Sequence, residues 1–263
     1  MKTSSKKWWK IADSLLRKPI GISSIPPLKR PDGTWARDGF SKATLLSETF
    51  RSKSQLPDPE INEFTPQALD LSELDNIKIE ITESMVLPVL KKLDINSGTG
   101  PDQIAARVLK FCQSELTYPI MLLCNRILAS GKWPMGWRLH WIHPIFKRKS
   151  RADPGNYRGV HLTSQLSKVC ERILYGVLLP YLDFGEHQFA YTAGRGHRDA
   201  LLSNILQWLL WLENGDQIGL YCSDVSGAFD RVSKDLLCRK LLSCKLPRCL
   251  FMVVTSWFDD RIS

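Results

Sequence analysis

The sequence predicts an α+β fold, because helical patterns fill most of the chain and strand patterns are few and short. Apolar residues recur at helical spacing through much of residues 81–263. Residues 141–146 alternate enough to form a strand, and residues 157–162 follow as its candidate hairpin partner. A short apolar run at 217–223, after a turn, is a third candidate strand. With 43% hydrophobic residues among 263, the chain can bury a core of ordinary composition.

Start and stop signals place the helices along the chain. Thr82 and Ser164 are residue types that cap helix N-termini, and Gly131 is the type that ends a helix. The expected helices cover residues 8–16, 85–93, 104–111, 116–129, 165–182, 199–211, 234–242 and 247–258.

Charge divides the first hundred residues. Residues 1–55 carry 12 Lys and Arg against 4 Asp and Glu, whereas residues 56–100 carry 3 against 9. Prolines are frequent in the first stretch and in the start of the second, as is typical of loosely ordered connections. We therefore expect residues 1–80 to be a partly disordered linker with a basic and an acidic part, and residues 81–263 to be the folded domain.

The chain as a whole is basic, with a net charge of +9 and a pI near 9.2. This balance favours an anionic partner, of which nucleic acid is the commonest. No apolar run reaches the roughly 18 residues that span a bilayer, and the N-terminus lacks the apolar stretch of a secretory signal. We expect an intracellular protein of the nucleus or cytoplasm that contacts no membrane.

Seven cysteines are present, an odd number with no C-x-x-C pair, which argues against a disulfide framework or a zinc ribbon. A metal cluster of Cys238, Cys244 and Cys249 is an alternative, but their spacing fits no zinc pattern. His140 and His143 lie three apart on a candidate strand edge, so they face opposite sides and make a poor metal pair.

The most informative segment runs from residue 221 to 232. Asp224 follows the apolar run, where a carboxylate can hold Mg²⁺, a cation that takes oxygen ligands. The small residues Gly227 and Ala228 let backbone N–H groups approach a triphosphate, and the flat ring of Phe229 can close a sugar pocket. This combination is what nucleotidyl transfer requires. The alternative is that Asp224 only caps the next helix.

The pattern Asp224-x-x-x-Ala228-Phe229-Asp230 resembles motif A of non-LTR (LINE-type) retrotransposon reverse transcriptases. Other blocks of the chain resemble further parts of that family and stand in the same order, so the resemblance covers nearly the whole sequence. They are the linker at 7–9 and 25–28, the entry to the fingers at 97–102 and 106–110, the turn at 131–138, the fingers hairpin at 144–149 and 156–158, the following helix at 166–174, and the block before motif A at 188–189, 194–195 and 199–201.

The resemblance implies roles around the nucleotide. Asp224 would be one of three metal-binding aspartates, and the Val225 carbonyl would complete its share of the metal shell. Gly227 and Ala228 would lie under the phosphates, and Phe229 would exclude a 2′-hydroxyl.

It also implies a basic hairpin and a template loop. Arg158 would contact the triphosphate, since Arg binds phosphate through a planar fork. One of Lys147, Arg148 or Lys149 would lie nearby, with a solvated basic turn as the alternative. The last implied group is a loop at the template side, for which a structural role is equally open: Gln188, Gly194 and Arg195.

The resemblance implies an RNA-directed DNA polymerase that uses an RNA template, a DNA primer, dNTPs and two Mg²⁺ ions. The fold would be the fingers and partial palm of a right-hand polymerase. Only 39 residues follow Asp224, too few for the Asp-Asp box and thumb, so we expect these 263 residues to be inactive alone. Trp257-Phe258-Asp259-Asp260 mimics that box but comes too soon and at a helix end.

Two alternatives remain open on the sequence. One is a non-catalytic nucleic-acid-binding remnant of a retroelement, and the other is a product with no stable fold. Departures from the family at Gly159, Ala190-Tyr191 and Arg198 put the template-side loop in doubt.

Overall fold

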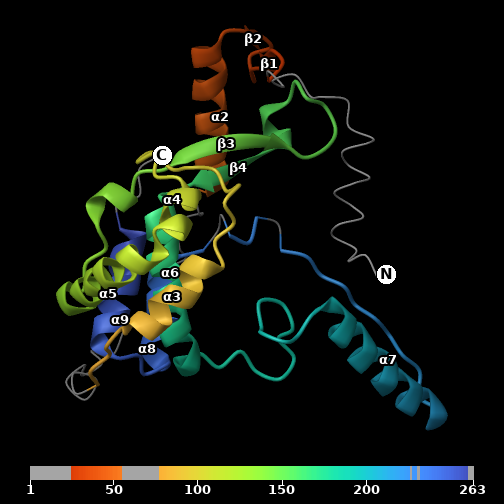
Figure 1. Ribbon diagram of the computed structural model, residues 1–263. Helices are drawn as coiled ribbons and strands as arrows, with labels where there is room; N and C mark the ends of the chain where they lie inside the picture. Colours follow the sequence, from red (N-terminus) through yellow and green to blue (C-terminus); the bar gives the residue numbers. More distant parts are fainter. Residues whose placement is uncertain (1–24, 55–76, 226, 230–231, 260–263) are drawn as a thin grey trace, which may run out of the picture. The chain divides into compact units, whose positions relative to one another are not determined.

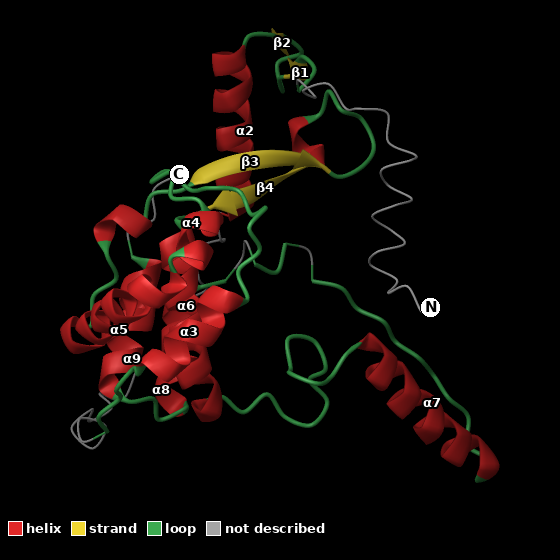
Figure 2. Cartoon of the chain, viewed as in Figure 1, coloured by secondary structure: helices red, strands yellow, loops and turns green. Residues whose placement is uncertain are grey.

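The computed structural model describes residues 25–54, 77–225, 227–229 and 232–259, and it has the expected mixture of helices and small sheets (Figures 1 and 2). The chain divides into two units, each described by itself. The hairpin unit contains residues 1–52 and 144–159, and the helical unit contains residues 53–143 and 160–263.

The hairpin unit begins with a small antiparallel ribbon, β1 (Leu28–Lys29) and β2 (Trp35–Ala36), with Leu28 opposite Ala36 and Lys29 opposite Trp35. Helix α2 (Gly39–Ser54) follows. Asp38 precedes it and accepts hydrogen bonds from the Ser41 hydroxyl and the Ser41 N–H (2.9 Å), which lower the pKa of Asp38. This satisfies a backbone donor at the start of the helix.

These elements differ from the sequence prediction, which placed no helix or strand between residues 25 and 54. The region folds because its few apolar side chains share a core with the distant Tyr157 and Phe146. Such long-range packing leaves no local periodicity to read. The predicted helix at 8–16 lies outside the described residues, and the predicted division at residue 80 stays a prediction.

The predicted hairpin is confirmed. Strands β3 (Trp141–Phe146) and β4 (Tyr157–Leu162) pair as a two-stranded sheet. Residues 147–156 join them and include a 3₁₀ turn, Pro154–Asn156. The ends of this loop are closed by a bond from the Lys147 N–H to the Asn156 carbonyl (2.9 Å).

The core of the helical unit lies among α3, α4, α5, α6 and α9, which all contribute buried side chains to one cluster. Their bounds, with those of α8 and two 3₁₀ turns, are α3 (Glu83–Lys91), α4 (Ala106–Phe111), α5 (Gln113–Ser130), α6 (Gln165–Leu178), α8 (Lys234–Ser243), α9 (Arg248–Phe258), η2 (Met135–Trp137) and η4 (Leu179–Tyr181).

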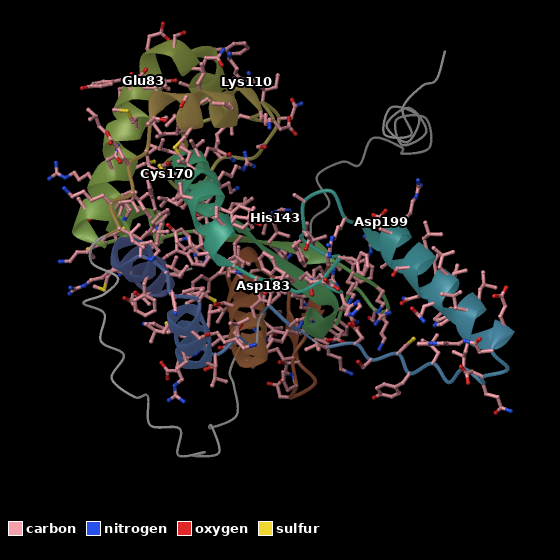
Figure 3. The ribbon with its side chains drawn as sticks, turned by 90° about the horizontal axis from the view of Figure 1, so that it is seen from below. Glu83, Lys110, His143, Cys170, Asp183 and Asp199 are labelled. Atoms are coloured by element: carbon pink, nitrogen blue, oxygen red, sulfur yellow. The ribbon has the colours of Figure 1, made fainter. Side chains whose placement is uncertain are left out.

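Side chains tie the helix ends of this unit together. The Asn125 amide on α5 exchanges two 2.8 Å bonds with the buried backbone of Ile81, just before α3. Lys110 of α4, labelled in Figure 3, donates to the Leu93 carbonyl after α3 (2.9 Å). The Ser256 hydroxyl on α9 accepts from the Trp133 N–H (3.0 Å), which fixes the chain leaving α5.

Two of the predicted helix signals are confirmed and one is not. Ser164 caps α6 by accepting from the Ser167 N–H, and Gly131 ends α5 with φ +63°, as predicted. Thr82 precedes α3, but its hydroxyl bonds that of Ser84 (2.8 Å) and caps no N–H. Helix α6 ends at 178 and not at 182, because Pro180 has no N–H to continue it.

Helix α7 (His197–Glu213) matches the predicted position and has no buried residue. Asp199 in its first turn accepts from the Gly196 N–H at 2.7 Å (Figure 3). Among the described residues, no helix combines the length and apolar character needed to cross a bilayer.

The turn at 97–102 packs against the start of α6. A Cβ on Gly100 would lie 2.5 Å from the backbone of Thr163 and Ser164. The buried Gln165 side chain donates to the Gly98 carbonyl. Through these contacts Gly98 and Gly100 join the chain before α4 to the start of α6.

Replacing Gly100 by Ala is expected to lower the free energy of unfolding by about 2 kcal/mol or more, because backbone must move to admit the methyl group. Gly98→Ala is the matched control, since its Cβ would meet only Leu162 at 3.8 Å, so its effect should stay within about 0.5 kcal/mol. Urea denaturation measures both variants. Equal midpoints for the two would contradict this packing role.

Candidate catalytic site

Asp224 follows an extended segment that is not a strand, so the predicted strand at 217–223 is wrong. Residues 216–225 form neither helix nor strand, and Leu220, Tyr221 and Val225 are 67%, 89% and 71% exposed. A strand needs a neighbour to take its backbone N–H and C=O groups. The two sheets of the described residues are β1–β2 and β3–β4, and neither includes this segment.

The Asp224 carboxylate is exposed and has no hydrogen-bond or ion-pair partner among the described residues. The alternative that it caps the next helix is wrong, because α8 begins at Lys234 and the Ser233 hydroxyl accepts from the Leu236 N–H (3.4 Å).

The turn after Asp224 carries the predicted small residues and aromatic ring. Gly227 has φ +64°, a conformation that favours glycine, and Gly227, Ala228 and Phe229 form the turn. Phe229 is 77% exposed. Ser226, Asp230 and Arg231 lie outside the described residues.

The loop predicted for the template side is held by its own contacts. The Gln188 amide donates to the Ala190 carbonyl (2.9 Å), and the Arg195 guanidinium donates to the Glu186 carbonyl (2.5 Å) and lies over the Phe189 ring (5.9 Å). Gly194 has φ +75°. These contacts explain the loop's shape, and its template role stays a prediction.

Tyr191 connects this loop to the turn after Asp224, a contact that sequence reasoning missed. Its ring meets that of Phe229 edge to face, with centroids 6.1 Å apart and planes at 87°. Aromatic pairs prefer this geometry. Tyr191 counted in the sequence only as a departure from the family pattern, and no local signal linked it to Phe229.

The predicted phosphate-binding cations belong to the hairpin unit, and Asp224 belongs to the helical unit. Arg158 is exposed on β4, directly after the buried Tyr157. Lys147, Arg148 and Lys149 are exposed in the loop after β3. With the exposed Arg151 in the same loop, the hairpin carries five cations.

The donor set fits part of a magnesium shell. The Asp224 carboxylate and the Val225 carbonyl are hard oxygen donors, which Mg²⁺ prefers. Among the described residues, no group of three or more His, Cys, Asp or Glu side chains gathers as a metal site. Asp224 alone cannot hold two ions.

Asp259, in the sequence that mimics the Asp-Asp box, and His140, of the histidine pair, both make contacts within the protein. Asp259, in the sequence that mimics the box, directly follows the end of α9 and forms an ion pair with Lys234. His140 is buried, and its ring meets that of His161 with centroids 4.6 Å apart, whereas His143 is exposed.

The cysteines are all free thiols. Cys238, Cys244 and Cys249 form no metal cluster within the described part of the chain. Cys124 of α5 and Cys170 of α6 are buried with their sulfurs 3.4 Å apart, and Figure 3 labels Cys170. The hydrogen bond from Cys124 and burial raise the pKa of the Cys170 thiol. These two cysteines serve as small core side chains.

Comparisons with known proteins find similarity to RNA-directed DNA polymerases of transposable elements. The chain is 25% identical over 262 residues to the probable RNA-directed DNA polymerase from transposon X-element and 27% identical over 267 residues to that from transposon BS, both of Drosophila melanogaster. It is 23% identical over 271 residues to the RNA-directed DNA polymerase from mobile element jockey of Drosophila funebris. Each alignment covers 96% of the chain.

The chain is a relative of non-LTR retrotransposon RNA-directed DNA polymerases. It spans 28% of the length of each of these three relatives. No protein-family model matches the chain. The resemblance drawn from motif A and the ordered blocks is thereby confirmed.

Iodoacetamide is expected to label the exposed Cys112 and Cys222 in the native chain while sparing Cys124 and Cys170. The raised pKa of Cys170 reduces its reactive thiolate, and burial blocks access to both thiols. Peptide mass spectrometry measures the labelling, and urea-unfolded protein, in which all seven should react, is the control. Native labelling of Cys170 as fast as that of Cys112 would show that this core is not formed.

Proposed function

We propose that the chain is part of the polymerase domain of a retrotransposon reverse transcriptase, which copies RNA into DNA. The observation that carries this proposal is the similarity over 96% of the chain to RNA-directed DNA polymerases. In this assignment residues 81–263 are the fingers and the start of the palm. RNA template, DNA primer and dNTP are the substrates.

Asp224 and the Val225 carbonyl are the chain's contribution to metal binding. When bound, two Mg²⁺ ions stabilise the attacking and leaving oxygens of the in-line displacement. Asp224 is exposed and unpaired among the described residues, so its carboxylate supplies negative charge and oxygen ligands without breaking an internal contact. In this assignment Asp224 is one of three metal-binding aspartates.

The turn after Asp224 shapes the sugar and phosphate pocket. Gly227 and Ala228 have no bulky side chains, so their backbone N–H groups can approach the phosphates. Phe229 excludes the 2′-hydroxyl of an rNTP. Its edge-to-face contact with Tyr191 limits the positions that the Phe229 ring can take.

The hairpin cations bind the triphosphate. Arg158 presents a planar fork of N–H donors from a strand, which holds it more firmly than a loop would. Lys147 and Arg148 add positive charge at the loop after β3. Gln188, Gly194 and Arg195 shape the loop on the template side.

Asp224 can be tested in a chimera, in which residues 1–263 replace the aligned segment of the transposon BS polymerase. RNA-templated dNTP incorporation should fall at least about 100-fold in Asp224→Ala, since losing a group that merely supports a metal ligand already costs about 10–100-fold. Primer extension with Mg²⁺ measures the rate.

Asp216→Ala is the matched control for this test, because Asp216 is an exposed carboxylate in the same extended segment. It should keep activity within about threefold, as an exposed side chain away from the chemistry. Equal activity of the two variants in an active chimera would contradict the proposed role of Asp224 in metal binding.

A second function, nucleic-acid binding without catalysis, is favoured by the charge of the hairpin unit. Its described residues, 25–52 and 144–159, contain ten Lys and Arg against four Asp and Glu, a net charge of +6. Such a surface attracts phosphate backbones without reading sequence.

The 263-residue chain alone is expected to bind RNA without incorporating dNTPs on a homopolymer template, because a single carboxylate cannot hold two ions about 3.5–4 Å apart. Affinity should fall as salt rises and should be unchanged in Asp224→Ala. Fluorescence anisotropy and primer extension give the two readouts. Incorporation that depends on Mg²⁺ and Asp224 would contradict the expectation of inactivity, and salt-independent affinity would contradict backbone binding.

A further inference from the structure

Residues 25–52 share one core with the tip of the β3–β4 hairpin, although residues 53–143 separate the two in the sequence. Figure 1 shows β1, β2 and α2 beside the hairpin within this unit. Leu28 and Ala36 are fully buried, and Tyr157 is 4% exposed. The apolar contact is therefore between the upstream segment and the base of the loop that carries the hairpin cations.

Polar contacts tie the same segment to the loop itself. The Lys29 N–H donates to the Ala152 carbonyl (2.8 Å), so β1 is bonded on one side to β2 and on the other to the loop. The Tyr157 hydroxyl donates to the Arg151 carbonyl (2.7 Å), and the Arg151 guanidinium lies 5.1 Å from the centre of the Phe146 ring. Both aromatic rings belong to the shared core.

The loop between β3 and β4, residues 147–156, is held by several internal hydrogen bonds. The Asp153 carboxylate accepts from the Gly155 N–H (2.8 Å), and the Asn156 amide donates to the Ser150 carbonyl (3.0 Å). Lys149 holds φ +68°, a region that a lysine rarely adopts. Such a conformation persists where the surrounding contacts determine it.

We infer that residues 25–52 are a positioning brace, which holds the hairpin loop in one conformation so that Lys147 and Arg148 are presented in a fixed arrangement with Arg158. This inference rests on the proposed function, in which these cations contact the triphosphate of a dNTP. The brace touches no reacting atom. It acts by removing the conformational freedom that the loop would otherwise lose when it binds phosphate.

Leu28→Ala tests the brace in the 263-residue chain, because Leu28 is fully buried and lies next to the Lys29 bond to the loop. The variant should raise hydrogen exchange of the Lys147 and Asn156 amides at least tenfold, measured by NMR, since the Lys147 N–H closes the loop and the Asn156 N–H donates to the Asp153 carbonyl within it. It should also weaken the affinity for dATP with Mg²⁺ at least threefold, in a titration that follows the same amides.

Three comparisons keep the result interpretable. Phe40→Ala removes an 84% exposed ring from α2 and should change neither readout. Leu28→Met keeps the core volume and should restore both. Exchange at Cys124 and Ile127, in the separate core of the helical unit, reports whether the rest of the chain stays folded.

Arg148→Ala separates positioning from contact, because it should weaken dATP binding and leave loop exchange unchanged. The brace is overturned if Leu28→Ala leaves exchange at Lys147 and Asn156 as in the wild type, or if exchange rises while dATP affinity is retained. Unchanged dATP binding in both Arg148→Ala and Arg158→Ala is a different outcome. It would remove the triphosphate role from the proposed function, and with it the purpose of the brace, even where loop exchange behaves as expected.

Discussion

A two-stranded hairpin is marginally stable by itself in water, so β3–β4 depends on the side chains packed around it. Tyr157 and Phe146 supply that packing in the hairpin unit, where they meet residues from β1, β2 and α2. At the other end of the strands, the His140 and His161 rings contact each other in the helical unit. The packing on Tyr157 and Phe146 orders a loop rich in cations although its like charges repel one another.

The sequence revealed those elements whose signals are local. Ser164 and Gly131 have the side chain and the backbone freedom that a helix start and a helix end need, and both are used as expected. Alternation predicted the strand at 141–146, and its candidate hairpin partner at 157–162 also has the observed bounds. Residues 25–54 gave no such signal, because part of their core, Tyr157 and Phe146, lies far away in the sequence.

For the segment before Asp224, the sequence predicted a strand that the structure does not contain. Its apolar residues match a strand pattern, yet a strand is a property of a pair, and the described residues offer this segment no neighbour. Asp224, Gly227 and Phe229 could be chosen from residue chemistry and family resemblance, and both are local in sequence. The contact between Tyr191 and Phe229 could not, because it joins two loops that are each irregular and separated by α7.

The carboxylates of the helical unit differ in whether they have partners inside the protein. Glu171 on α6 accepts from the Ser167 hydroxyl (2.8 Å) and the Trp257 indole N–H (3.3 Å), so its charge joins α6 to α9. Asp259 is paired with Lys234. Asp224 has no such task among the described residues, and the helix that it was a candidate to cap is capped by Ser233. Glu171 and Asp259 thus have packing roles within the helical unit, whereas no contact with the described residues gives Asp224 such a role.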